Sequence, residues 1–79
     1  MNTHKIIQKV LGLTIFNICE GGMKHEDAFE KALETESSDN KTVQAIFEKI
    51  RSGLKAINNA AVAATYCKGV LVDLQAFCS

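Results

Sequence analysis

The chain has 79 residues, of which 47% are hydrophobic, 23% are charged and none is proline, and its formal net charge is zero. This length fits one small domain spanning residues 1–79, and the apolar content excludes an intrinsically disordered chain. The zero net charge argues against nucleic acid as the main ligand, and the lack of a long uninterrupted apolar run argues against a membrane span. A core of this size rarely supplies more than ~3–5 kcal/mol, so a partner would help to stabilise the fold.

A first helix is predicted from about residue 3 to residue 20. Asn2 or Thr3 can cap its start. Gly21 and Gly22 are expected to end it, because glycine adopts the left-handed conformation of helix C-termini without strain. Its broad apolar face consists of Ile6, Ile7, Val10, Leu11, Leu13, Phe16 and Ile18.

A second, shorter helix is predicted from about residue 25 to residue 35, with Glu26 and Asp27 in the first turn, where the helix dipole favours acids. Its buried stripe consists of Ala28, Phe29, Ala32 and Leu33. The polar segment 37–40 then breaks the helix, and Ser37, Ser38 or Asp39 is expected to cap the next helix.

Acidic residues concentrate in one part of the chain, since residues 20–39 hold seven of the nine Asp and Glu. Such a segment can dock a basic partner or pair with basic side chains of the same chain. We favour pairing within the chain, because charge runs usually form solvated faces.

Apolar residues beyond position 40 follow heptad spacing. The seam consists of Val43, Phe47, Ile50, Leu54, Ile57, Ala61 and Ala64, and continues through Cys67, Leu71, Leu74 and Cys78. The two successive steps of three from Ala61 to Cys67 indicate a local overwinding of the supercoil. One long helix over about 40–77 is therefore predicted. A break at Asn58-Asn59 would instead give a four-helix arrangement. We favour the continuous helix, because a reversal of direction usually takes a longer loop, often with glycine.

These elements predict an all-α fold in which a short helical hairpin packs on one long C-terminal helix. Small side chains cluster on that helix, and small residues let two helices approach closely. The predicted interface consists of Gly53, Ala56, Ala60, Ala63, Ala64, Cys67, Leu71 and Leu74. If this stripe faces solvent, the alternative interface lies on the first helix around Ile7, Leu11 and Phe16.

No pattern in the sequence specifies chemistry. Cys19 and His25 lie close together, but no orienting group or oxyanion loop accompanies them, and no spacing matches a metal site. We expect no catalytic residue, no cofactor and no metal. The three cysteines, Cys19, Cys67 and Cys78, are odd in number, and no signal-peptide cleavage site follows the first apolar run. Free thiols in the reducing cytoplasm are therefore expected.

The apolar segment 60–77 exceeds what so small a chain can bury, which predicts a partner, either a second copy in a homo-oligomer or another protein. The expected function is a non-enzymatic regulator, inhibitor or adaptor of a larger bacterial or phage machine. The alternative is a self-assembling subunit of a ring or filament. A helical hairpin, a polar Ser-Asp turn and a long C-terminal helix resemble the small subunits of type III secretion needles, which implies that second function. The proline of that family's turn is missing here, and the three cysteines depart from its pattern.

Overall fold

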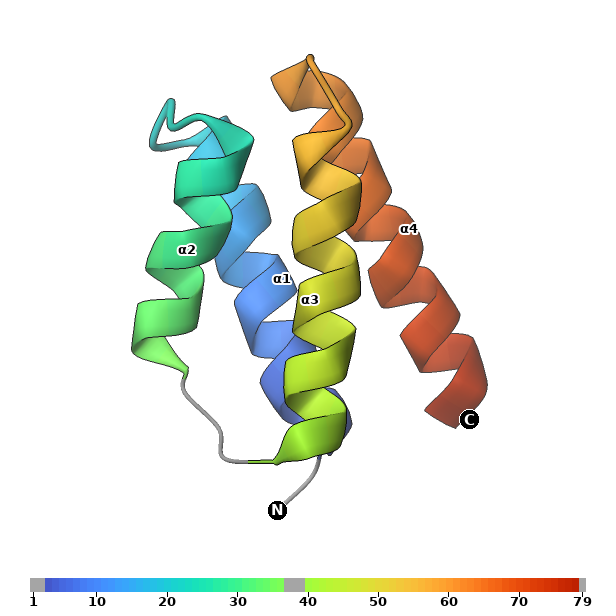
Figure 1. Cartoon of the computed structure of the whole chain (residues 1–79). Coiled ribbons are helices and arrows are strands. Elements are labelled where there is room, and N and C mark those ends of the chain that lie inside the picture. Colours follow the sequence, from blue (N-terminus) through green and yellow to red (C-terminus); the bar gives the residue numbers. More distant parts are fainter. Residues whose placement is uncertain (1–2, 37–39, 79) are drawn as a thin grey trace.

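A computed structural model of the chain describes residues 3–36 and 40–78, with side chains described as far as Leu74. Within these residues the structure is all-helical, and its helices are α1 (Thr3–Cys19), α2 (His25–Thr35), α3 (Lys41–Lys55) and α4 (Ala60–Cys78) (Figure 1). The predicted all-α class is confirmed, as are both helices of the N-terminal hairpin.

The turn between α1 and α2 contains two glycines, Gly21 and Gly22. Gly22 has a positive φ of 64°, which glycine adopts without a steric penalty. A Cβ on Gly21 would lie 2.7 Å from the carbonyl oxygen of Asn17, so this position also requires glycine. The side-chain amide of Asn17 donates to the carbonyl oxygen of Ala28 at 3.2 Å, and this bond ties the end of α1 to α2.

Asn40 caps the start of α3. Its side-chain oxygen accepts hydrogen bonds from the backbone N–H groups of Thr42, at 2.8 Å, and Val43, at 3.2 Å. The cap is therefore the fourth residue of the polar segment rather than one of the first three, and Ser37, Ser38 and Asp39 lie outside the described residues. Asn2, one of the two caps proposed for α1, also lies outside them.

The preferred prediction of one long C-terminal helix is wrong, and the alternative of a break at Asn58-Asn59 is correct. Helix α3 ends at Lys55 and α4 begins at Ala60. The side-chain oxygen of Asn59 accepts from the backbone N–H groups of Ala61, at 2.8 Å, and Val62, at 3.2 Å, which is the geometry of a helix N-cap. The two steps of three from Ala61 to Cys67 lie inside α4, where Ala61 is exposed and does not belong to the buried face, so they do not indicate an overwound supercoil.

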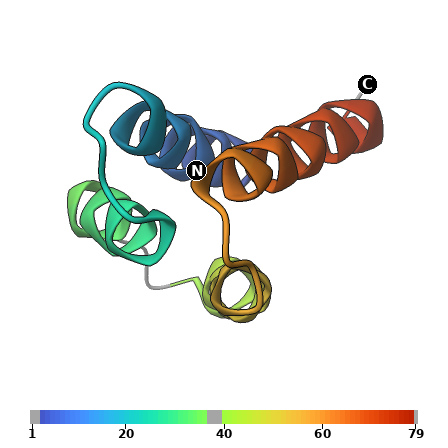
Figure 2. The ribbon, with the colours of Figure 1, turned by 90° about the horizontal axis from the view of Figure 1, so that it is seen from above.

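The helices form two layers. Figure 2 shows α1 beside α4 in one layer and α2 near α3 in the other, and α1 shares most of its contacts with α2 and α4. All four helices contribute to one core: Ile6, Ile7, Val10, Leu11 and Ile18; Ala28, Phe29 and Ala32; Val43, Phe47, Ile50 and Leu54; Ala63, Ala64 and Cys67. Past these residues α4 leans away from α3, and Leu71 and Leu74 are only half-buried.

Candidate functional site

The residues predicted as an interface do not form one surface. Ala63, Ala64 and Cys67 are 0%, 5% and 0% exposed, so the chain's own core covers them. Their small size allows α4 to approach α1 closely within a single chain. Leu71 and Leu74 extend this inner face of α4 and remain half-buried.

The other three predicted residues lie near the junction of α3 and α4. Ala56 and Ala60 are exposed on either side of the linker. Gly53 lies beneath the ring of Tyr66, where an added Cβ would come within 2.5 Å of the phenolic oxygen. Gly53 therefore serves the contact between α3 and α4 of the same chain, and Ala56 and Ala60 are the exposed members of the predicted set.

A second stripe lies on the opposite side of α4 from the core. It consists of Val62, Thr65, Gly69 and Val72, which recur at spacings of three, four and three, and all four are exposed. We call these residues the outer stripe. Val62 is 55% exposed and Val72 is 61% exposed, high values for valines on a helix that already fills a core. The sequence-based prediction missed this stripe because it assigned the helix to one seam. The spacing that begins at Val62 is the signal that could have found it.

Two opposite charges flank the outer stripe. Lys68 and Asp73 are both exposed, and five residues at 3.6 per turn place them on opposite sides of the stripe. Neither forms an ion pair with another described residue. The outer face of α4 is thus a weakly apolar strip with a cation along one edge and an anion along the other.

The alternative interface on α1 does not form one face. Ile7 and Leu11 are 1% and 0% exposed and belong to the core. Phe16 is 59% exposed, and its position in the helix places it on the far side of α1 from these two residues. The expectation that all three share a surface is therefore wrong, and Phe16 alone is open to a partner.

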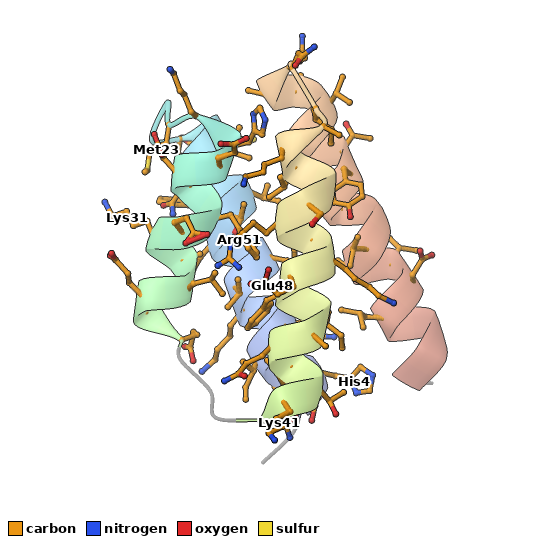
Figure 3. All side chains as sticks on the ribbon, in the orientation of Figure 1. His4, Met23, Lys31, Lys41, Glu48 and Arg51 are labelled. Carbon is orange, nitrogen blue, oxygen red and sulfur yellow. The ribbon has the colours of Figure 1, made fainter. Side chains whose placement is uncertain are left out.

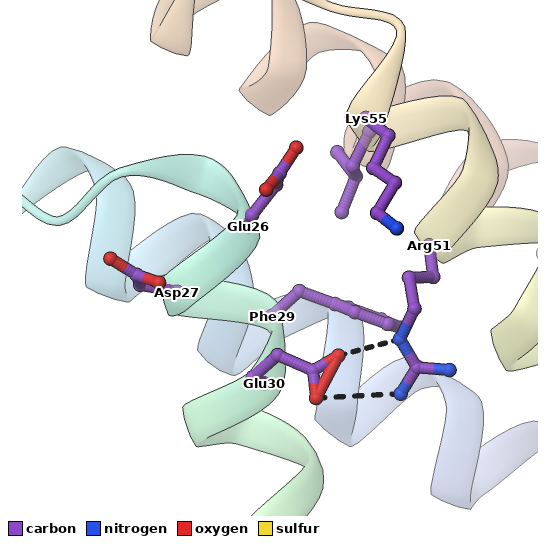
Figure 4. A pocket seen from close by; sticks show the side chains of 7 residues that line it. Glu26, Asp27, Phe29, Glu30, Arg51 and Lys55 are labelled. Atoms are coloured by element: carbon purple, nitrogen blue, oxygen red, sulfur yellow. Dashed lines mark hydrogen bonds and ion pairs between the residues drawn. The ribbon is translucent and has the colours of Figure 1, made fainter.

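A groove of about 270 Å³ lies between α2 and α3, and Phe29, Leu54, Glu26 and Lys55 are among the residues that line it (Figure 4). Acids of α2 and bases of α3 face each other across it, so it has no single sign of charge. Lys55 and Glu26 make no ion pair with the described residues. This mixed lining specifies no particular ligand.

Arg51 lies at the centre of this region, between α2 and α3 (Figure 3). Its Nε and Nη2 atoms donate to the two carboxylate oxygens of Glu30 at 2.6 and 3.4 Å, and its Nη1 donates to Glu48. The hydrogen bonds to Glu30 are the main reason that the pKa of Arg51 is raised. The guanidinium carbon also lies 5.9 Å from the centre of the Phe29 ring. Together with a 3.7 Å ion pair between Lys9 and Glu36, these contacts pair part of the acidic segment within the chain, as favoured.

The cysteines and His25 occupy different environments. Cys67 is buried, and its burial raises the pKa of the thiol to about 11, so it stays protonated and inert at neutral pH. Cys19 is exposed at the end of α1, and both thiols are free. The side chain of Cys78 lies outside the described side chains. His25 Nε2 donates to the carbonyl oxygen of Ile57 at 2.7 Å, which ties the start of α2 to the linker before α4.

Among residues 3–36 and 40–78, no three His, Cys, Asp or Glu side chains come together as metal ligands. No described helix is both long enough and apolar enough to cross a bilayer. Comparison with protein-family models, curated proteins and solved structures finds no match to this chain.

Proposed function

We propose that this chain is a non-enzymatic protein that acts by protein–protein contact, as a small regulator, inhibitor or adaptor of a larger machine. The contact surface in this proposal is the outer stripe of α4, flanked by Lys68 and Asp73. The role of α1, α2 and α3 is to hold α4 by its inner face and leave its outer face free.

The observation that carries the proposal is the exposure of valines at both ends of the outer stripe. Val62 is 55% exposed and Val72 is 61% exposed, although the opposite face of the same helix is buried. A helix that is apolar on two opposite faces is typically covered on both. Covering the exposed part of each valine would stabilise a complex by roughly 1 kcal/mol. Such a gain suits a modest contact that depends on additional polar interactions at its edges.

Photo-crosslinking in the cells that produce this protein tests the proposal. A photoreactive phenylalanine analogue is placed at position 72 on the outer stripe, and at position 31 as a control. Lys31 is exposed on the outside of α2, away from α4 (Figure 3). We expect covalent adducts to protein from position 72 and few from position 31. Equal or absent adducts at both positions would show that the outer stripe is not a contact surface.

A self-assembling subunit is the second candidate, and one observation favours it. Open assemblies join two different surfaces of each chain, head to tail. Phe16 provides a second exposed apolar residue, 59% exposed, on α1 rather than on α4. Light scattering on the purified protein distinguishes the two candidates. A mass that keeps growing with concentration beyond that of a dimer supports the assembling subunit, and a mass that levels off at a monomer or dimer supports the regulator or adaptor.

A further inference from the structure

We infer that the outer stripe binds a second copy of itself, so that two chains pair in parallel through α4, with Lys68 of each copy bound to Asp73 of the other. This inference rests on the proposed use of the outer stripe as a contact surface, and it makes a second copy of the chain, rather than another protein, the partner on that stripe, with a stated orientation and register.

The register follows from the heptad positions of the outer stripe. Its residues take the a and d positions, with Val62 and Gly69 at a and Thr65 and Val72 at d. Lys68 then occupies a g position and Asp73 the e position of the following heptad. In parallel pairs of helices, charges at g and e form the interhelical ion pairs that set partner choice and orientation. A two-fold axis parallel to the two α4 helices would relate the copies, so this ion pair would form twice.

The charges also disfavour the opposite orientation. In an antiparallel pair, each edge of the helix meets the same edge of its partner. The two Lys68 side chains would then share one edge of the pair and the two Asp73 side chains the other, so neither edge would bring opposite charges together. Within one chain the two residues point to opposite sides of α4, so they cannot pair with each other. Charge complementarity is therefore available only to a second helix in parallel.

Gly69 supports a close helix partner at this place. Glycine is a poorer helix former than alanine, and a Cβ at Gly69 would touch nothing in the chain. Nothing in the chain's own packing therefore requires glycine here, unlike at Gly53. A glycine at the centre of the stripe lets a second backbone approach. The proposed contact runs from Val62 to Val72, about 15 Å of helix, which is short for the stable interfaces that bury ~1,200 Å² or more. The dimer is therefore weak and depends on concentration.

Charge reversal tests the register. Sedimentation of the purified chain should show its mass rising from 8.6 kDa toward twice that value with concentration. Lys68→Glu alone and Asp73→Lys alone should each weaken self-association at least threefold. An equimolar mixture of the two variants should associate again, and so should the double variant, since each restores opposite charges across the pair. Lys31→Glu, on exposed α2, is the matched control and should change nothing. A wild-type chain that stays at 8.6 kDa throughout overturns the inference.

Cross-linking tests the orientation, because a d residue meets its own copy only in a parallel pair. In a background where Cys19 and Cys78 are replaced by serine, Val72→Cys should form a disulfide-linked dimer in a glutathione buffer. Lys31→Cys in the same background should remain monomeric. Association without a Val72→Cys disulfide would contradict the parallel arrangement. If the pure chain is monomeric while position 72 crosslinks another protein in cells, the inference fails and the proposed function stands. If position 72 crosslinks nothing in cells, the proposed function fails.

Discussion

Three glycines lie within the described helices of this chain, and the space available to an added methyl group differs between them. A Cβ at Gly12 or Gly69 would touch nothing within 4 Å, whereas at Gly53 it would lie 2.5 Å from the Tyr66 hydroxyl and 2.8 Å from its Cζ. Gly69→Ala and Gly12→Ala should raise the free energy of unfolding by up to ~1 kcal/mol, because alanine is the better helix former. At Gly53 that gain is offset by overpacking that costs ~1–3 kcal/mol.

Urea unfolding at low protein concentration, where the chain is monomeric, measures this difference. We expect Gly53→Ala to be neutral or destabilised while the two other variants are stabilised. Equal stabilisation of all three would show that Tyr66 moves aside freely and that Gly53 is not required for the packing of α3 on α4.

Because of the Cys67 thiol, the free energy of unfolding should change with pH in the alkaline range. Burial raises its pKa to about 11 from the usual 9.0. The folded chain therefore holds this proton more tightly than the unfolded chain does. Stability from this group is complete below pH 9 and falls as pH rises toward 11, by at most ~1.4 kcal/mol per pH unit. Cys67→Ala should be less stable at neutral pH but should lose less stability over this interval.

Other groups also titrate in this range, so the informative quantity is the difference in slope between wild type and Cys67→Ala. Cys19→Ala is the matched control, because Cys19 is exposed, and it should keep the wild-type slope. Identical slopes for wild type and Cys67→Ala would mean that the thiol is not buried in the folded protein.

Two adjacent asparagines, Asn58 and Asn59, have different roles in the break between α3 and α4. Asn59 accepts two backbone hydrogen bonds from the first turn of α4, whereas Asn58 is an exposed linker residue with no side-chain bond in the described structure. Asn59→Ala should lower the free energy of unfolding by ~0.5–2 kcal/mol, as the loss of an N-cap does. Asn58→Ala should change it by less than ~0.5 kcal/mol. Thermal unfolding followed by circular dichroism measures both, and equal effects would contradict the cap assignment.

The elements that the sequence predicted correctly are those with local signals. Gly21 and Gly22 end α1, and the spacing from Val43 to Leu54 is typical of a single buried helix face, which the structure confirms. The break after Lys55 has a weaker local signal, because the linker contains no glycine. The linker at this break is held by His25, which lies 32 residues before Ile57 and whose ring donates a hydrogen bond to the carbonyl oxygen of Ile57. A contact between such distant residues has no trace in the local pattern.

The candidate interface was also only partly predictable from the local sequence pattern. Small residues such as Ala63 and Ala64 indicated a close helix contact, and such a contact exists, but the partner helix is α1 of the same chain. Residue size does not say whether the neighbouring helix is internal or foreign. Once the inner face was known to be buried, the spacing of Val62 and Val72 on the opposite face could be recognised as a separate stripe.

Polar and aromatic contacts join α2 to α3 in addition to the shared apolar core. Arg51 reaches from α3 to Glu30 on α2 and lies over Phe29, whose ring meets that of Phe47 edge to face at 6.1 Å. The Arg51 side chain is one-third exposed, so water screens the ion pair only in part. Arg51 therefore adds an ion pair and a cation–aromatic contact between α2 and α3, beside the buried rings of Phe29 and Phe47.

Replacing Arg51 with alanine should lower the free energy of unfolding by about 0.7–2 kcal/mol. Ion pairs of this exposure contribute ~0.2–1 kcal/mol, and the cation over the Phe29 ring adds ~0.5–1 kcal/mol. Lys49→Ala, on an exposed side of the same helix, is the control and should cost less than ~0.5 kcal/mol. A double-mutant cycle with Glu30→Gln isolates the ion pair, whose coupling should shrink in high salt while the aromatic part remains. A cycle with no coupling at low salt would mean that Arg51 stabilises the contact of α2 with α3 only through its packing on Phe29.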